Sequence, residues 1–366
     1  MYHHGTESYE VAVSNAAKKF QQKIEDMIHV SVPRVERVIE QVQNDVPEDM
    51  VALGRLLRFN PTTSGIQILP PTKNAEALTI HDHALQQICD RPKIKNLATV
   101  VRELRGRGQW GNELAATNLT EIYSHLNGDR FLIRNVRGEV RGFLSDQFRR
   151  LDSRPLLDAF VGALRQFGAR PVDGFALDTK VNIRAILPMV FEPFPGEIMA
   201  FGAQLSDSDY GDGKLSVRGF VLRMWCTNLA TTEDVLSQIH LGRRLSDNVT
   251  FSQQTLELDT QAMASAVKDV SGHVLGSGAV NNYLDMIRKA NEQKIEPAQI
   301  GAWVKKNLTK AESEHAIEKF NSPDVEMLPP GQTKWRWSNA LSWLANETED
   351  EHRKLELQEF AGGILK

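Results

Sequence analysis

The chain has 366 residues, of which 41% are hydrophobic and 25% are charged, as in an ordinary soluble globular protein. It has no run of about 18 apolar residues and no basic segment followed by an apolar one at its start, so neither a membrane span nor a secretory signal is expected. Two cysteines, Cys89 and Cys226, are too few for a disulfide scaffold or a four-cysteine zinc site, and they fit a reducing cytoplasm. The net charge of −4 argues against a globally basic nucleic-acid binder but leaves a locally basic one open.

The N-terminal segment has the residue spacing of helices. Residues 9–31 carry apolar side chains at helical intervals, and Pro33 is expected to end this helix and to open a second one that runs to about Val42. We expect an arm or an oligomer-forming pair of helices over residues 1–45. A short extended piece is expected at residues 66–69. Three further helices are predicted at about 80–89, 97–104 and 113–126.

In the middle of the chain the apolar period changes to that of strands. Strands are predicted at 131–136, 139–144, 175–187, 198–205 and 214–225. A helix near residues 155–167 interrupts them, and a polar loop at 206–213 joins the last two strands. Beyond Thr232 the pattern is again helical, with helices predicted at 233–239, 259–274, 280–292, 298–307, 310–320 and from about 335 to an acidic stretch at 347–351.

This order of elements predicts an α+β fold, with a central, mostly antiparallel sheet flanked by N-terminal and C-terminal helical regions. Strands that cluster between helices differ from the regular alternation of parallel α/β folds. We therefore divide the chain into a helical N-terminal arm (1–45), an α+β core (46–258) and a helical C-terminal region (259–366).

The net charge hides an asymmetry along the chain. Residues 91–170 contain 15 basic and 8 acidic residues, a net of +7, and all but two of these cations are arginines. The flanks are acidic, with nets of −4 over residues 1–90 and −7 over residues 171–366. The basic stretch is either a solvated helical face or a surface that follows phosphates, to which the arginine fork is well suited.

The segment Gly106–Gly111 matches the pattern G-x-G-x-x-G. It follows a helical pattern rather than a strand, so a loop between two helices is favoured over a dinucleotide site. Its interleaved side chains also suit a nucleic acid, because a base can stack on Trp110 while Arg105 and Arg107 meet phosphates.

A two-residue turn at Arg137-Gly138 is predicted to join the first two strands as a hairpin. Such a turn places Arg134 directly opposite Arg141, and like charges opposed across a ladder are destabilising. One resolution is that Glu139, diagonal to Arg134, neutralises the pair. The other is an external anion, such as a nucleic-acid backbone, bound between the two guanidinium groups on the outer face of the hairpin.

The predicted polar loop is rich in aspartate. Asp207, Asp209 and Asp212 resemble a calcium loop only loosely, because the twelfth position is Arg218 instead of a glutamate, so a solvated hairpin loop is favoured. A metal-dependent nuclease would need clustered carboxylates. The aspartates available for one are Asp146, Asp152, Asp207, Asp209 and Asp212.

No other metal or catalytic site is predicted. His81 and His83 are two residues apart on a predicted helix and so face different ways. Cys226 ends an apolar strand and is expected to be a buried structural thiol rather than a nucleophile. No cofactor motif is found.

Three separated stretches of the sequence form one pattern. They are Gly142–Asp152 with Pro155–Leu157, Arg218–Asn228, and Thr333–Trp335 with Asn339-Ala340. Their order and spacing, over about residues 130–350, resemble the phage/plasmid-like protein family, a domain of unknown function. In that family a glycine usually follows the Cys-Thr-Asn of the second stretch, whereas Leu229 follows Asn228 here. The resemblance implies a protein encoded by a phage, plasmid or integrative element, acting in the cytoplasm of a bacterial host, with no activity to carry over.

Together these features predict a non-enzymatic protein of a phage or mobile element that binds single-stranded DNA, for protection or annealing, as a homo-oligomer. No cofactor, metal, catalytic group or membrane contact is part of this prediction. The contacts to nucleic acid are assigned to Arg105, Arg107, Trp110, Arg134, Arg141, Arg149 and Arg150. The acidic C-terminal end could cover the basic face when no nucleic acid is bound.

Two alternatives remain open. One is a structural or interaction protein of a phage particle or host-takeover complex, with protein contacts made by the N-terminal helices and by Trp335, Trp337 and Trp343. The other is the metal-dependent nuclease.

Overall fold

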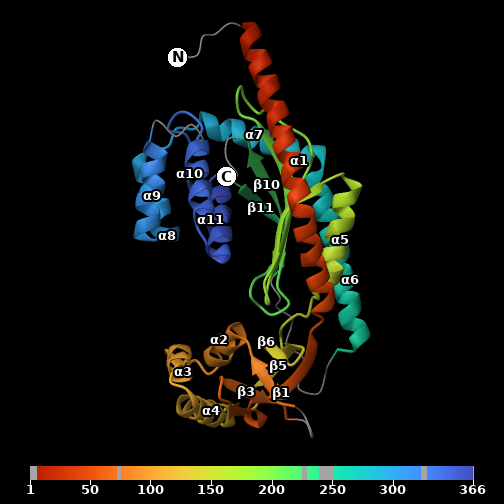
Figure 1. Cartoon of the computed structure of the whole chain (residues 1–366), viewed down its shortest axis with the longest axis vertical. Coiled ribbons are helices and arrows are strands. Elements are labelled where there is room, and N and C mark those ends of the chain that lie inside the picture. Colours follow the sequence, from red (N-terminus) through yellow and green to blue (C-terminus); the bar gives the residue numbers. More distant parts are fainter. Residues whose placement is uncertain (1–5, 72–75, 225–228, 239–250, 323–327, 366) are drawn as a thin grey trace.

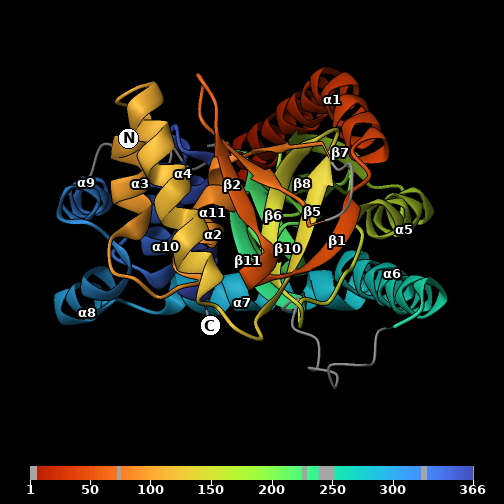
Figure 2. The same ribbon diagram turned by 90° about the horizontal axis from the view of Figure 1, so that it is seen from below.

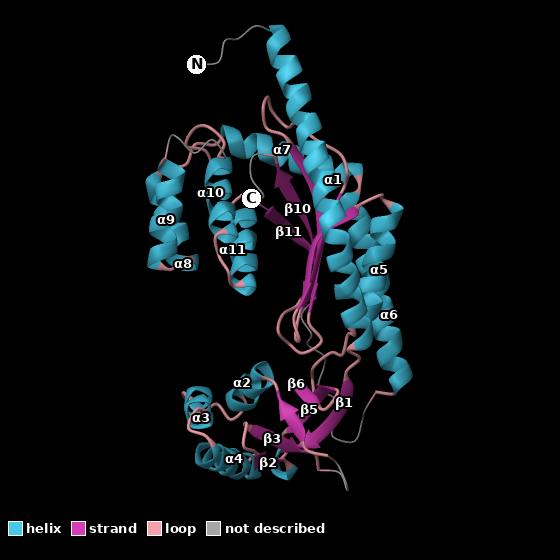
Figure 3. Ribbon diagram, viewed as in Figure 1, coloured by secondary structure: helices cyan, strands magenta, loops and turns pink. Residues whose placement is uncertain are grey.

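The computed structural model describes residues 6–71, 76–224, 229–238, 251–322 and 328–365. Within these ranges the chain folds into two lobes (Figure 1). The larger lobe holds a five-stranded sheet with helices on both sides, and the smaller lobe holds a six-stranded sheet with three helices (Figure 3). The α+β class is thus confirmed, with an N-terminal helix, mostly antiparallel sheets and a C-terminal helical region, but the strands form two sheets instead of one central sheet.

The N-terminal segment is a single helix, α1 (Thr6–Asn44), and the predicted break at Pro33 is wrong. Proline removes one helical hydrogen bond. Here packing outweighs that loss, because α1 lies along strand β7 (Arg170–Ala176), and the Ser31 hydroxyl donates to the Val172 carbonyl at 2.6 Å. The N-terminal helix is therefore attached to the larger lobe over much of its length.

The smaller lobe contains β1 to β6, in the order β1-β5-β6-β4-β3-β2, and all neighbours are antiparallel except β4 and β6. The strands are β1 (Glu48–Leu53), β2 (Arg58–Pro61), β3 (Ile66–Leu69), β4 (Leu78–Ile80), β5 (Arg130–Val136) and β6 (Glu139–Ser145). A short 3₁₀ turn follows β1 at Gly54–Leu56. The core of this lobe is aromatic. Tyr123 lies between Phe59, Phe131 and Phe143, with ring centroids 5.3–5.7 Å from its own.

Three helices cover one side of this sheet: α2 (Asp82–Asp90), α3 (Leu97–Arg105) and α4 (Gln109–Ser124). Figure 2 shows α4 running beside β2. The predicted helix at 80–89 begins slightly later, because residues up to Ile80 pair as β4, and His81 caps α2 by accepting a bond from the His83 amide.

The glycines between α3 and α4 have a structural role. Gly108 has a φ of +80°, which favours glycine in the turn that starts α4. Gly111 lies against α3 so closely that an added Cβ atom would sit 1.9 Å from the Leu104 carbonyl oxygen. The G-x-G-x-x-G pattern is therefore explained by a tight helix–turn–helix, as expected for a loop between two helices.

The larger lobe contains an antiparallel meander in the order β11-β10-β9-β8-β7. The remaining strands are β8 (Val181–Ile186), β9 (Met199–Asp207), β10 (Leu215–Arg223) and β11 (Leu229–Gln238). The single strand predicted at 175–187 is two strands joined by a turn. The helix predicted at 233–239 is wrong over the described residues up to Gln238, because they complete the sheet by pairing with β10. Long-range pairing overrides local helical spacing here.

Helices cover both faces of the five-stranded sheet (Figure 1). On one side are α5 (Ser153–Gln166) and α6 (Gln253–Leu275), which pack on an apolar face. On the other side is α11, which the sequence did not predict, while α7 packs in the same core as α5 and α6. The helices after α6 are α7 (Ser277–Glu292), α8 (Pro297–Asn307), α9 (Lys310–Asn321), α10 (Lys334–Asn346) and α11 (Glu351–Gly363). Among the described helices, none has both the length and the apolar character needed to cross a bilayer.

The contact at Gly111 gives a prediction for stability. We expect Gly111→Ala to lower the free energy of unfolding by about 2 kcal/mol or more, because the methyl group would push α4 away from the Leu104 carbonyl. Gly162→Ala is the matched control, since Gly162 lies in helix α5 with nothing within 4 Å of the added atom. There the change should be neutral or stabilising by up to about 1 kcal/mol. Urea denaturation of both variants measures this, and a neutral Gly111→Ala would contradict the close packing.

Candidate nucleic-acid interface

Arg134 lies inside the molecule, although the sequence placed it on an outer face. Its side chain is 2% exposed. Its guanidinium group donates to Asp49 Oδ1 at 2.7 Å, to Asp152 Oδ1 at 2.8 Å and to the Asp209 carbonyl oxygen at 2.9 Å. Burial lowers the pKa of Arg134, but the carboxylates of Asp49, Asp209 and Asp152 outweigh that effect and hold the pKa above its ordinary value. This arginine therefore joins the two lobes and offers no face to a phosphate.

The predicted opposition of two arginines in the hairpin is also wrong. The turn at Arg137-Gly138 is confirmed, with φ of +51° and +82°, as a two-residue turn of this kind requires. A β-bulge after Arg134 shifts the register, so that Arg134 pairs with Gly142 and not with Arg141. The bulge thus removes the like-charge contact, and no anion is needed between the two side chains.

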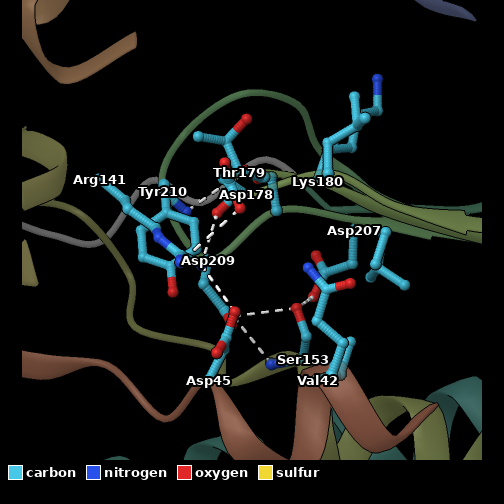
Figure 4. Close-up of a pocket in the computed structure, with 15 residues that line it drawn as sticks. Val42, Asp45, Arg141, Ser153, Asp178, Thr179, Lys180, Asp207, Asp209 and Tyr210 are labelled. Atoms are coloured by element: carbon cyan, nitrogen blue, oxygen red, sulfur yellow. Dashed lines mark hydrogen bonds and ion pairs between the residues drawn. The ribbon is translucent and has the colours of Figure 1, made fainter. Parts of the chain in front are cut away.

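Arg141 is held by carboxylates of this chain. Its side chain is 11% exposed and donates to Asp45 at 2.8 Å and to Glu139 at 3.3 Å, with Asp178 at 3.7 Å. Burial lowers the pKa of Arg141, but the hydrogen bond to Asp45 and the nearby charges raise it above its ordinary value. Figure 4 shows Arg141 and Asp45 at the pocket between the lobes.

Arg149 and Arg150, which were also predicted to contact nucleic acid, bind carboxylates of this chain instead. Arg149 makes a bidentate ion pair with Asp259 at 2.6 and 2.7 Å, and this hydrogen bonding raises the pKa of Arg149 and lowers that of Asp259. Arg150 lies 3.4 Å from Asp49. These arginines fasten the segment before α5 to α6 and to β1. The stretch Gly142–Asp152, one of the three that resemble the phage/plasmid-like family, thus carries arginines that hold segments of this fold together.

The predicted hairpin loop between β9 and β10 is present, but its first half is buried and not solvated as predicted, while Gly211 and Gly213 are exposed. Ser208 is 1% exposed and Tyr210 is 5% exposed, because the loop enters the smaller lobe. The Tyr210 carbonyl oxygen lies 3.1 Å from His83 Nε2 and accepts from Gln87 at 2.9 Å, both on α2. The loop therefore reaches from the larger lobe into the smaller one, and it meets Arg134 at the junction of the lobes.

Two carboxylates of this loop share one hydroxyl group. The Ser153 hydroxyl lies 2.8 Å from Asp207 Oδ2 and 3.0 Å from Asp209 Oδ1, and the Ser153 amide also donates to Asp209 (Figure 4). One hydroxyl proton cannot serve both acceptors, so both contacts are hydrogen bonds only if one carboxyl carries a proton. Burial raises the pKa of Asp209 to about 7, with the Asp207 charge adding to it and Arg134 opposing it. Asp209 is therefore the partner that carries the proton below about pH 7.

The last three nominated residues lie on the surface of α3 and α4. Trp110 is 59% exposed and Arg107 is exposed in the turn between the helices. The Arg105 side chain is 27% exposed and donates to Asp82 at 2.9 Å. Seven residues were predicted to contact nucleic acid. Of these, four arginines are held by internal carboxylates, and the other three residues lie at one helix–turn–helix.

Sequence reasoning missed several exposed residues in the same segment of the chain as Trp110. Three further exposed cations and three apolar side chains between 45% and 48% exposed lie on the same helices or just before them. They are Lys93, Lys95 and Arg102, and Ile94, Val100 and Leu114. Between residues 91 and 118 there are six cations and two carboxylates. We use the name α3–α4 face for one set of residues, namely Lys93, Ile94, Lys95, Val100, Arg102, Arg105, Arg107, Trp110 and Leu114. A count of charges over this shorter window would have pointed to it.

Other predicted features have different outcomes. Trp335 is fully buried in the core of the larger lobe and Trp337 in the core of the C-terminal helices, so neither is available for protein contacts, while Trp343 is partly buried against the second of these cores. Cys226 lies outside the described residues. Among the residues that the structure describes, no group of three or more His, Cys, Asp or Glu is placed to hold a metal ion.

Comparisons with known proteins give no family assignment. No family model, curated protein or solved structure matches the chain. The resemblance to the phage/plasmid-like family rests on three short stretches and stays a prediction.

The burial of Arg134 predicts a large effect on stability. We expect Arg134→Gln to lower the free energy of unfolding by about 3 kcal/mol, because it leaves the carboxylates of Asp49 and Asp152 without their buried partner. The control is Arg137→Gln. The Arg137 side chain is 69% exposed, so its ion pair with Asp45 is weakened by the surrounding water. Its loss should cost less than about 1 kcal/mol. Similar, small losses for both variants in urea denaturation would contradict the role given to Arg134.

The protonated Asp209 predicts a pH dependence. An ordinary aspartate titrates near pH 4, so between about pH 4 and 7 the folded chain holds a proton that the unfolded chain has lost, and stability falls as the pH rises through this window. Asp209→Asn keeps the oxygen that accepts from Ser153 and has no proton to lose. From about pH 5 to pH 8 we expect the wild type to lose about 2 kcal/mol more than the variant. Urea denaturation at the two pH values measures the difference, and parallel pH profiles would argue against a protonated Asp209.

Proposed function

We propose that this chain binds single-stranded DNA through the α3–α4 face, as a non-enzymatic protein of a phage or mobile element. The observation that carries the proposal is the exposed indole of Trp110 beside exposed cations on a helix–turn–helix. An exposed indole in a segment that also carries other exposed apolar side chains and cations is more informative than a single exposed apolar residue, because exposed apolar patches mark binding sites. The role in protection or annealing, and assembly as a homo-oligomer, belong to the same proposal.

The chemistry of the face suits a flexible strand. Cations follow the phosphates and provide affinity without reading sequence, while every base offers a flat surface that can stack on an indole. Arg107 lies in the turn itself, three residues before Trp110 in the chain, so phosphate and base contacts come from one short segment. Duplex DNA keeps its bases stacked on one another, and this favours a single strand as the ligand of Trp110.

A second candidate function is protein binding at the same face. It is favoured by the apolar residues Ile94, Val100 and Leu114, which are exposed on the face together with Trp110. A protein partner would bury these side chains, whereas a DNA strand needs mainly the indole and the cations. The next two experiments distinguish the two functions, because only DNA binding falls steeply with salt.

Arg107→Gln tests the phosphate contact. A fluorescent single-stranded oligonucleotide is titrated with the full chain at several salt concentrations, and the affinity of the wild type should fall steeply with salt. The variant should lower the slope of log affinity against log salt by about 0.7, the amount expected for one phosphate contact to a single strand. Arg165→Gln removes the same charge from an exposed position on α5 in the other lobe and should leave affinity and slope nearly unchanged.

Trp110→Ala tests the stacking contact. We expect a loss of about 1–3 kcal/mol in binding free energy with no change in the salt slope, because stacking releases no counterions. Met189→Ala, at a residue 55% exposed in the larger lobe, is the control for removal of an exposed apolar side chain. Absence of binding by the wild type at low salt would overturn the proposed function and would favour the protein-binding alternative.

A further inference from the structure

A second cluster of cations lies on one face of the five-stranded sheet. Neighbouring strands align polar side chains in two rows, and the register pairs Asn182 with Ser206 and Ser206 with Ser216 in the first row. In the second row Gln204 stands between two arginines, paired with Arg184 on β8 and with Arg218 on β10. We name this set the polar sheet face. Its members are Asn182, Arg184, Gln204, Ser206, Ser216 and Arg218.

Polar and apolar residues alternate along these strands, as they do in a sheet that has one face exposed to water. Residues between the members of the polar rows, such as Ile183 on β8 and Leu205 on β9, belong to the apolar core beneath α5 and α6. Antiparallel sheets commonly pack one face on a core and expose the other to solvent. Here the polar rows are at most 7% exposed, because the C-terminal helices lie over them (Figure 1). Burying six polar side chains is costly unless each finds a partner.

The cover is helix α11, which presents oxygen acceptors to both arginines. Gln358 Oε1 accepts a hydrogen bond from Arg184, whose charge is also paired within the sheet with Asp173 on β7 at 3.1 Å. Glu359 Oε1 lies 2.5 Å from Arg218 Nη1, so α11 supplies the carboxylate for this second arginine. The Glu359 side chain is 45% exposed, so this ion pair lies at the edge of the covered surface. A carboxylate bound to an arginine fork has the charge and geometry of a phosphate in the same place. Helix α11 thus covers arginines of this sheet. The acidic stretch at 347–351, which the sequence suggested as a cover for residues 91–170, precedes most of this helix, and Glu347, Glu349 and Asp350 are exposed.

The cover does not satisfy the whole face. Asn182 is fully buried, and neither polar atom of its amide has a partner within the described part of the chain. An orphaned buried amide costs about 1–3 kcal/mol, and such a group calls for an explanation. A ligand that donates and accepts hydrogen bonds, as a nucleobase edge or a sugar does, would satisfy it.

Helix α11 is joined to the C-terminal helices independently of the sheet. Arg353 makes a bidentate ion pair with Glu312 on α9 at 2.7 and 2.8 Å. The Ser338 hydroxyl on α10 donates to the Ala361 carbonyl, and Leu357 packs in the core shared by these helices. These contacts lie within the helical group, so α11 keeps them if the group moves away from the sheet. Such a movement also has to withdraw Trp335 of α10 and Leu365 from the core of the larger lobe.

We propose that the polar sheet face is a second binding surface for the phosphodiester backbone of single-stranded DNA, and that α11 occupies it until DNA displaces the helix. This inference rests on the proposed function, because it assigns the same class of ligand to a second surface. Arg184 and Arg218 lie on strands separated by β9, about 10 Å apart at the usual strand spacing, so they bind separate phosphates of one strand. Gln204, Ser206, Ser216 and the free amide of Asn182 line the surface between and beside them.

The test removes the carboxylate that competes with DNA. Glu359→Gln in the full chain should raise the affinity for a short fluorescent oligothymidylate at low salt by about three- to tenfold. Glu356→Gln is the matched control, because it removes the same charge from the same helix at a side chain that is 64% exposed and pairs with Arg353. It should change the affinity less than twofold. Adding Arg218→Gln to Glu359→Gln should abolish the gain.

A measurement on the wild type avoids any effect of substitution on folding. Backbone amides of α11 should exchange hydrogen faster when the oligothymidylate is present, because the helix has left the sheet. Equal affinities for the Glu359→Gln and Glu356→Gln chains, or unchanged exchange in α11, would overturn the inference. A gain that survives Arg218→Gln would also overturn it, because the affinity would then come from net charge alone.

The two proposals fail separately. Loss of binding in Arg107→Gln and Trp110→Ala, together with no gain in Glu359→Gln, would leave the α3–α4 face as the binding site and would refute the polar sheet face. A gain in Glu359→Gln that requires Arg218, in a chain indifferent to Trp110→Ala, would support the polar sheet face and refute the proposed use of the α3–α4 face.

Discussion

The placement of the two lobes depends on the guanidinium group of Arg134. It stands on β5 in the smaller lobe and contacts β1, the segment before α5 and the loop between β9 and β10. A buried charge of this kind requires partners around it, and two of those partners are distant in the chain, since Asp49 lies 85 residues before Arg134 and Asp209 lies 75 residues after it. The arrangement of the lobes is therefore set by the electrostatic need of one side chain.

The loop between β9 and β10 supplies one of the acceptors of Arg134, but it also buries a carboxyl group. It places Asp209 against Ser153 and near a second carboxylate, where burial raises the pKa of Asp209 to about 7. Close packing supports the same contact, because an added Cβ atom at Gly142 would lie 3.3 Å from the backbone of Tyr210. The junction thus combines a fully paired arginine with a carboxyl group that carries a proton below about pH 7.

The same physics distinguishes the arginines of the basic stretch. A side chain such as Arg149, bound at two points by Asp259, has already used its fork within the fold. An exposed residue such as Arg107 has not, and only such a residue can release counterions from DNA. On the polar sheet face Arg184 is held within the sheet by Asp173 and Gln204, whereas the carboxylate paired with Arg218 is carried by a separate helix, α11, so that this pair is exchangeable where those of the junction are not.

The sequence by itself determined the fold class, most helices, and the hairpin turn at Arg137-Gly138, because these follow from local periodicity and from turn chemistry. It also pointed to Trp110 and Arg107. Only the tertiary structure decided which arginines are buried, because a β-bulge changed the hairpin register and because carboxylates distant in the chain, such as Asp49, converge on Arg134. Local patterns do not record such pairings. For the same reason, strand β11 and the cover formed by α11 were not foreseen, since both depend on contacts with a sheet that exists only in the folded chain.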